Sequence, residues 1–192
     1  MIYFDDYKEF YNVFKLAAEG DIDATKEMLN YLTLLTADSN DTEMIRMLKA
    51  TFIDRLVDES SSVGWIKKGD YIIENLKNEE DLKSALKCYL RGAMMGDTFG
   101  FDMIGETYYK GIAGEPDYEM AWIFFWLSIE YSNVPNALSL CRIGQMFKYG
   151  QRVDINEDDA SFFLSKAIEV AGEYADVDDY ALLAKKELAE LV

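Results

Sequence analysis

The stretch that decides the fold is Ile104–Ala121, IGETYYKGIAGEPDYEMA, because its pattern returns at Ile143–Ala160 as IGQMFKYGQRVDINEDDA. In both copies an Ile-Gly pair is followed at fixed offsets by an aromatic residue, a glycine, an Asp or Asn, and an alanine. A weaker third copy, KGDYIIENLKNEEDLKSA, occupies residues 68–85. The copies follow one another at spacings of 36 and then 39 residues. Recurrence of this kind predicts a stack of similar helix pairs.

Each recurring position has a structural reason. The repeat glycines stand sixteen residues before an alanine, in the pairs Gly69 and Ala85, Gly105 and Ala121, and Gly144 and Ala160. A glycine inside a helix costs about 1 kcal/mol relative to alanine, so these positions predict a close approach of the paired helix, with the small alanine completing the crossing. Gly111 and Gly150 tolerate a left-handed backbone and are typical of a helix end. Asp117 and Asn156 suit the start of the second helix, where their side chains accept from unpaired N–H groups.

The pattern resembles the Sel-one-like repeat (SLR) family, a branch of the tetratricopeptide-type (TPR-like) helical solenoids. The resemblance covers roughly residues 60–172 and departs from the family at Lys68, which replaces an apolar residue, and at Asn75, which replaces a glycine. The lysine usual before the repeat alanine is also missing, and its positions hold Ser84, Met120 and Asp159. The resemblance implies an all-α fold, a right-handed α-α superhelix (solenoid) of stacked antiparallel helix hairpins, and a role in protein–protein interaction.

We expect a single helical-repeat domain over residues 1–192, with about ten helices. No segment alternates polar and apolar residues for long enough to predict a strand. Residues 1–60 are interpreted as degenerate N-terminal helices, 61–172 as three Sel-one-like repeats, and 173–192 as a C-terminal capping helix. This last helix has one apolar and one charged side, as the end of a solenoid requires.

The chain is strongly acidic, with a net charge of −17 from 36 acidic and 19 basic residues. Residues 154–192 alone hold eleven acids and three lysines. Such a field repels nucleic acid and anionic membranes and accelerates encounters with basic proteins. The alternative interpretation is that the charge serves solubility alone.

Catalytic and metal-binding chemistry is not indicated. Histidine is absent, which removes the usual general base and the commonest metal ligand. The acidic segment 154–159 lacks the glycine and the bidentate glutamate of a calcium loop, so we expect it to cap a helix. We therefore predict no enzyme, no catalytic residue, no cofactor and no metal site. Cys88 and Cys141 are expected to be reduced, the first buried and the second able to reach the surface.

The resemblance also implies where a partner binds, because the first helix of each pair lines the concave surface of TPR-like stacks. Carrying the register over predicts a partner-binding set of acidic, aromatic and amide residues: Asp70, Glu74, Phe99, Asp102, Glu106, Tyr109, Gln145 and Tyr149. Carboxylates pair with guanidinium groups and tyrosine adds amphipathic contact area, so this set suits a lysine- or arginine-rich protein. The alternative is an ordinary solvated helix face.

These observations favour a non-enzymatic protein-binding module that captures a basic protein partner on an acidic concave surface. The start of the chain lacks the basic residues of a secretory signal, so a cytoplasmic location is expected. Short, acidic SLR proteins without a signal are similar to immunity proteins, and the most concrete expectation is an inhibitor that neutralises a nuclease-like bacterial toxin. A general adaptor or scaffold in bacterial signalling or assembly is the alternative. Neither nucleic acid nor membrane is an expected partner, and the oligomeric state stays open.

Overall fold

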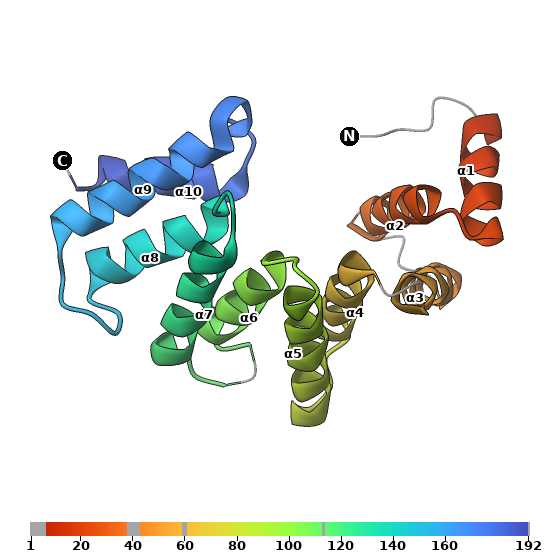
Figure 1. Cartoon of the computed structure of the whole chain (residues 1–192), viewed down its shortest axis with the longest axis horizontal. Helices are drawn as coiled ribbons and strands as arrows, with labels where there is room; N and C mark the ends of the chain where they lie inside the picture. Colours follow the sequence, from red (N-terminus) through yellow and green to blue (C-terminus); the bar gives the residue numbers. More distant parts are fainter. Residues whose placement is uncertain (1–6, 38–42, 59–60, 113, 192) are drawn as a thin grey trace. The chain divides into compact units, whose positions relative to one another are not determined.

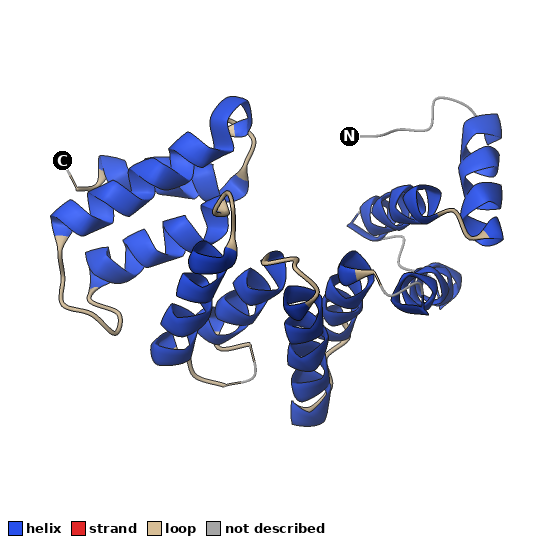
Figure 2. Ribbon diagram, in the orientation of Figure 1, coloured by secondary structure: helices blue, strands red, loops and turns tan. Residues whose placement is uncertain are grey.

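The computed structural model describes residues 7–37, 43–58, 61–112 and 114–191. These residues form ten α-helices and one short 3-10 helix, and they include no strand (Figure 1, Figure 2). The all-α prediction and the expected number of helices are confirmed. None of the helices in these ranges is both long enough and apolar enough to span a bilayer. In chain order the helices are α1 (Tyr7–Glu19), α2 (Ile22–Ala37), α3 (Glu43–Asp58), α4 (Ser62–Glu74), α5 (Glu79–Met94), α6 (Phe99–Lys110), α7 (Tyr118–Tyr131), α8 (Ala137–Tyr149), α9 (Glu157–Ala171), η1 (Gly172–Tyr174) and α10 (Asp179–Ala189).

Backbone contacts divide the chain into two compact units, Met1–Cys88 and Tyr89–Val192, with the boundary inside α5. In the first unit each helix from α1 to α4 packs against the next. Large apolar side chains from α2 and α3 form its core, namely Met28, Leu29, Leu32, Phe52, Ile53 and Leu56. The interpretation of residues 1–192 as one domain stays a prediction.

The second unit is built around α8. Helix α6 pairs with α7 and α8 pairs with α9, while α10 packs against both α8 and α9. Because α7, α9 and α10 all contact α8, every residue from Ala137 to Met146 is buried. Cys141 is therefore fully buried, and the expectation that it reaches the surface is wrong. Burial also raises the pKa of its thiol to about 12.

The repeat glycines of the second unit lie at close crossings, as predicted, but the facing residue is larger than expected. A Cβ placed on Gly105 would lie 2.6 Å from the ring of Phe125. A Cβ placed on Gly144 would lie 2.8 Å from Cγ of Leu164. Each glycine thus forms a notch for a fully buried side chain of the second helix. The expectation that the small alanine completes the crossing is wrong, because the side chain of the residue four positions beyond it fills the space.

The predicted helix ends are confirmed in the same unit. Gly111 and Gly150 end α6 and α8 with φ of 60° and 66°, in the left-handed region that favours glycine. The Asp117 side chain accepts a hydrogen bond from the N–H of Met120 at the start of α7. Asn156 caps α9 in the same way. These ends fix where each hairpin turns and hence which residues of α6 and α8 face one another.

Candidate protein-binding surface

The structure distributes the predicted binding residues over both units. Asp70 and Glu74 lie on α4 in the first unit, where Asp70 is half-buried and Glu74 is exposed. The Glu74 carboxylate accepts a hydrogen bond from Lys49 Nζ at 3.0 Å. The other six predicted residues lie on α6 and α8 of the second unit, and the arrangement around them is described below.

Three of those six are not on the surface. Asp102, Glu106 and Gln145 are only 1%, 4% and 6% exposed, so the expectation that they face solvent is wrong. The reason is that α6 contacts α8 and α8 contacts α10, which places the residues beside the repeat glycines between neighbouring helices. The side chains bond to this chain instead, and their part in partner binding stays a prediction.

Glu106 and Gln145 belong to a series of polar contacts, here called the polar ladder, formed by Glu106, Arg142, Gln145, Lys148 and Glu187. Its first pair is bidentate, because Arg142 Nη2 and Nε donate to the two Glu106 carboxylate oxygens at 2.6 and 2.8 Å. Burial favours a raised pKa for Glu106, but the hydrogen bonds and charges of Arg142 and Lys110 outweigh it and hold that pKa below its usual range. Glu106 is therefore ionised and already paired.

Aromatic rings enclose this first pair. The Arg142 guanidinium carbon lies 4.6 Å from the ring centre of Tyr109 and 5.3 Å from that of Tyr180. The Tyr180 hydroxyl also donates to Glu106 at 3.0 Å. The predicted binding residue Tyr109 is half-buried, and its hydroxyl donates to Gln151 at 3.0 Å. It packs against the ladder and does not stand free.

The second pair of the polar ladder joins α8 to α10. Lys148 Nζ donates to a Glu187 carboxylate oxygen at 2.7 Å, and the Tyr149 hydroxyl donates to the same oxygen at 2.5 Å. Gln145 links the two pairs, because it accepts from Arg142 and donates to Glu187, both at 2.8 Å. Each buried glutamate of the ladder thus faces a cation. The ladder ties three helices together and contributes no excess negative charge to the surface.

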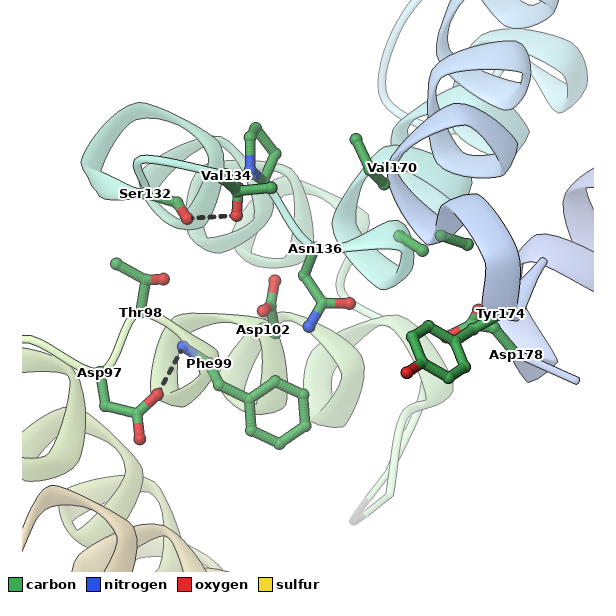
Figure 3. Close-up of a pocket in the computed structure, with 13 residues that line it drawn as sticks. Asp97, Thr98, Phe99, Asp102, Ser132, Val134, Asn136, Val170, Tyr174 and Asp178 are labelled. Atoms are coloured by element: carbon green, nitrogen blue, oxygen red, sulfur yellow. Dashed lines mark hydrogen bonds between the residues drawn. The ribbon is translucent and has the colours of Figure 1, made fainter.

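The remaining two predicted residues are exposed: Phe99 is 36% exposed and Tyr149 is 48% exposed. Phe99 borders a cavity of about 500 Å³ where α6, α8 and α10 begin (Figure 3). We call this cavity the acidic pocket and define it by the residues on which its chemistry depends: Asp97, Phe99, Asp102, Asn136, Tyr174 and Asp178. No basic residue is among the described residues that line it.

Asp102 projects from α6 at the wall of the acidic pocket, toward the segment that carries Asn136 (Figure 3). The Ser139 hydroxyl donates to its Oδ1 atom. Its Oδ2 atom and the nearby Ser128 hydroxyl are both buried, and no described basic side chain bonds to either of them. Burial raises the pKa of Asp102 to about 6, against the opposing effects of the Ser139 and Ser128 hydroxyls and with a further rise from the negative charges of Asp97 and Glu106.

The sequence pointed to only part of this pocket. Phe99 and Asp102 were in the predicted set, whereas Asn136 and Asp178 had no predicted binding role. Both of these cap helices, since the Asn136 side chain accepts from the N–H of Leu138 and Asp178 accepts from two N–H groups of α10. A capping residue gives a recognisable local signal, but that signal does not reveal that three helix starts meet around one cavity.

Comparison with known proteins identifies the architecture. No protein-family model matches the chain, and neither does any curated protein. A Sel1 repeat protein from Oxalobacter formigenes is similar in structure, with a TM-score of 0.60, 19% identity, and coverage of 98% of this chain and 50% of that one. A second is c5321, a protective antigen present in uropathogenic Escherichia coli strains that displays an SLR fold, with a TM-score of 0.53, 13% identity, and coverage of 97% and 52%.

The chain therefore has the fold of a helical repeat protein. More specifically, its fold is that of the SLR proteins, as the recurring glycines and alanines predicted. The chain spans about half the length of these two solved structures.

Proposed function

We propose that the chain is a non-enzymatic protein-binding module that captures a basic protein on the acidic surface around its pocket. The observation that carries the proposal is the gathering of Asp97, Asp102 and Asp178 about one cavity that no described lysine or arginine lines. The polar ladder on the same helices matches each glutamate with a cation, whereas the carboxylates around the pocket have no described basic residue beside them. A helical repeat of SLR type supplies a rigid surface for such contacts.

The charge of the whole chain supports the same partner. The net charge is −17, and most of the eleven acids in residues 154–192 are exposed. Long-range attraction from such a surface raises the association rate with a positively charged protein and makes that rate sensitive to salt. Exposed aromatic residues beside the carboxylates, Phe99 and Tyr174, add contact area of the kind that anchors protein interfaces.

In its most concrete form, the proposal is a cytoplasmic immunity protein that neutralises a nuclease-like toxin. Nucleases are basic where they bind phosphate, so an acidic protein that covers this region competes with nucleic acid for the same charges. The support is the charge and the fold. A general adaptor is the alternative, and it differs in predicting several modest partners whose binding depends weakly on salt.

The test is inhibition of a basic nuclease domain encoded beside this chain. The full chain is titrated into a cleavage assay, and association is followed at several salt concentrations. We expect complete inhibition near equimolar protein and an association rate that falls steeply as salt rises. Unimpaired cleavage with the protein in excess refutes the inhibitor, and salt-insensitive capture of the same domain favours the adaptor.

Two double variants locate the surface. Glu173→Gln with Asp179→Asn removes two exposed acids beside the pocket, and we expect slower association. Glu157→Gln with Asp158→Asn removes two exposed acids at the other end of α9, about 20 Å away by helix length, and serves as the matched control. Equal slowing by both pairs would show that only the total charge matters.

A further inference from the structure

Asp102 differs from the other buried carboxylates of the described chain. Glu106 and Glu187 each accept a hydrogen bond from a basic side chain. Asp102 has only hydroxyl groups beside it: Ser139 donates to Oδ1 and Ser128 lies next to the carboxylate, whereas no basic side chain among the described residues pairs with it. A buried carboxylate without a full set of partners costs free energy unless it is protonated or meets a cation. The Asp102 carboxylate lines the pocket without a cation, and it therefore marks a place for a positively charged donor from outside the chain.

The walls of the acidic pocket suit an organic cation. Phe99 and Tyr174 border it from two different elements, α6 and η1, and are 36% and 64% exposed (Figure 3). Aromatic rings attract a cation placed over their faces. The cavity of about 500 Å³ falls within the range of about 300–1,000 Å³ that is usual for pockets that hold small groups.

The helix starts at this pocket do not favour an anion. The first N–H groups of a helix can bind negative charge, but here side chains of the chain already accept from them. Asn136 accepts from Leu138 N–H at 2.9 Å, and Asp178 accepts from the N–H groups of Tyr180 and Ala181 at 3.0 and 2.8 Å. With these donors occupied and no base on the described lining, the net charge of the pocket is negative.

The same unit already contains a guanidinium held by a carboxylate and two aromatic rings. Arg142 donates to the Glu106 carboxylate while its guanidinium lies over the rings of Tyr109 and Tyr180. A guanidinium is planar and can combine a carboxylate with aromatic faces, whereas an ammonium is a compact charge that holds its water more strongly. A carboxylate with two neighbouring rings is the combination that the acidic pocket presents without a partner.

We propose that the acidic pocket binds one arginine side chain of the protein partner. The guanidinium donates to the Asp102 carboxylate and packs against Phe99 and Tyr174. Asp97 and Asp178 add negative charge around it. This inference rests on the proposed function, because it names the group of the basic partner that the acidic surface recognises.

The test is a titration of the full-length, isotopically labelled chain with short capped glycine peptides, followed by NMR. One peptide carries a single arginine, a second carries citrulline, which is its uncharged analogue, and a third carries lysine. We expect saturable shifts at the amides of Phe99, Asp102 and Tyr174 with the arginine peptide, shifts at least about tenfold weaker in affinity with lysine, and none with citrulline. Equal binding of citrulline or lysine overturns the proposal, as does the absence of shifts with arginine.

Variants separate recognition from folding. Asp102→Asn keeps the shape of the side chain, and we expect a loss of affinity on the order of thirtyfold, as when one partner of a buried charge pair is removed. Tyr174→Leu changes an exposed ring without changing charge, and it should weaken binding of arginine more than binding of lysine. Glu157→Gln on α9 is the charge-matched control and should leave binding unchanged. Undiminished binding by folded Asp102→Asn refutes the proposal.

The inference and the proposed function can fail separately. If the chain inhibits the nuclease and Asp102→Asn inhibits it equally well, the arginine pocket is refuted and the acidic module stands. If the arginine peptide binds as expected but the chain neither captures nor inhibits a basic nuclease, the proposed toxin inhibitor is refuted.

Discussion

Replacing Asp102 with asparagine should stabilise the protein at neutral pH. Burial raises the pKa of this carboxyl from 3.8 to about 6, and each pKa unit corresponds to about 1.4 kcal/mol. The ionised side chain therefore disfavours the folded state by about 3 kcal/mol above pH 6. Asparagine removes this cost, still accepts from Ser139, and adds N–H donors beside the Ser128 hydroxyl.

The pH dependence follows from the direction of the shift. Because the folded state holds the proton more tightly than the unfolded state, the protonated carboxyl favours folding at low pH, and this advantage is lost as pH rises from about 4 to 6. The negative charges of Asp97 and Glu106 strengthen the effect. The gain from Asp102→Asn should thus approach about 3 kcal/mol at pH 7 and fall toward zero near pH 4.

Urea unfolding followed by the fluorescence of the tryptophans checks this prediction, with native chain and variant compared at the same pH. Asp97→Asn is the control, because Asp97 is half-buried and accepts a hydrogen bond that asparagine can also accept, and its effect should stay within about 0.5 kcal/mol. A variant that is less stable at pH 7, or one whose gain is equal at pH 4 and pH 7, would refute the reasoning. Higher stability together with lost arginine binding would mark Asp102 as a residue kept for recognition at the expense of stability.

Three further outcomes are expected. Arg142→Met leaves the Glu106 carboxylate buried without its bidentate partner, and urea unfolding should show a loss of about 3–5 kcal/mol, most of which the double variant with Glu106→Gln restores. Gly105→Ala places a Cβ 2.6 Å from the Phe125 ring, so thermal unfolding should reveal a loss of about 1–3 kcal/mol; an unchanged midpoint would contradict the notch. The Cys141 thiol, whose pKa burial raises to about 12, should resist a thiol reagent at pH 8 in the folded protein and react once denaturant is added, and rapid labelling of the native chain would disprove its burial.

Local features of the second unit could be predicted because their causes lie close together in the sequence. The left-handed ends at Gly111 and Gly150 and the caps at Asp117 and Asn156 depend on a few neighbouring residues, and all four are as expected. The repeat spacing then indicated which helices pair. For these features the physical cause of the structure is contained within one hairpin.

The direction of the polar side chains could not be predicted in the same way. Glu106 was placed on an exposed face from the register of one hairpin, but it meets Arg142 of the next hairpin, 36 residues later. Gln145 likewise meets Glu187 of α10, 42 residues later. Charges of opposite sign at nearly one repeat spacing were a usable signal. The acidic pocket could not be predicted from such a signal. Its residues come from several separate turns, and the relative placement of these turns depends on how the helices pack.

The notches at Gly105 and Gly144 also bear on how such a protein can be re-engineered. One accommodates the flat ring of Phe125 and the other the branched side chain of Leu164, so the two hairpins differ in how their helices pack at the glycine. Exchanging their second helices would place the smaller leucine against Gly105 and leave a cavity there. It would also place the larger phenylalanine ring against Gly144, where it would clash. The hairpins of this chain are therefore not interchangeable. Any shuffled or consensus version has to transfer each repeat glycine together with the side chain that packs against it.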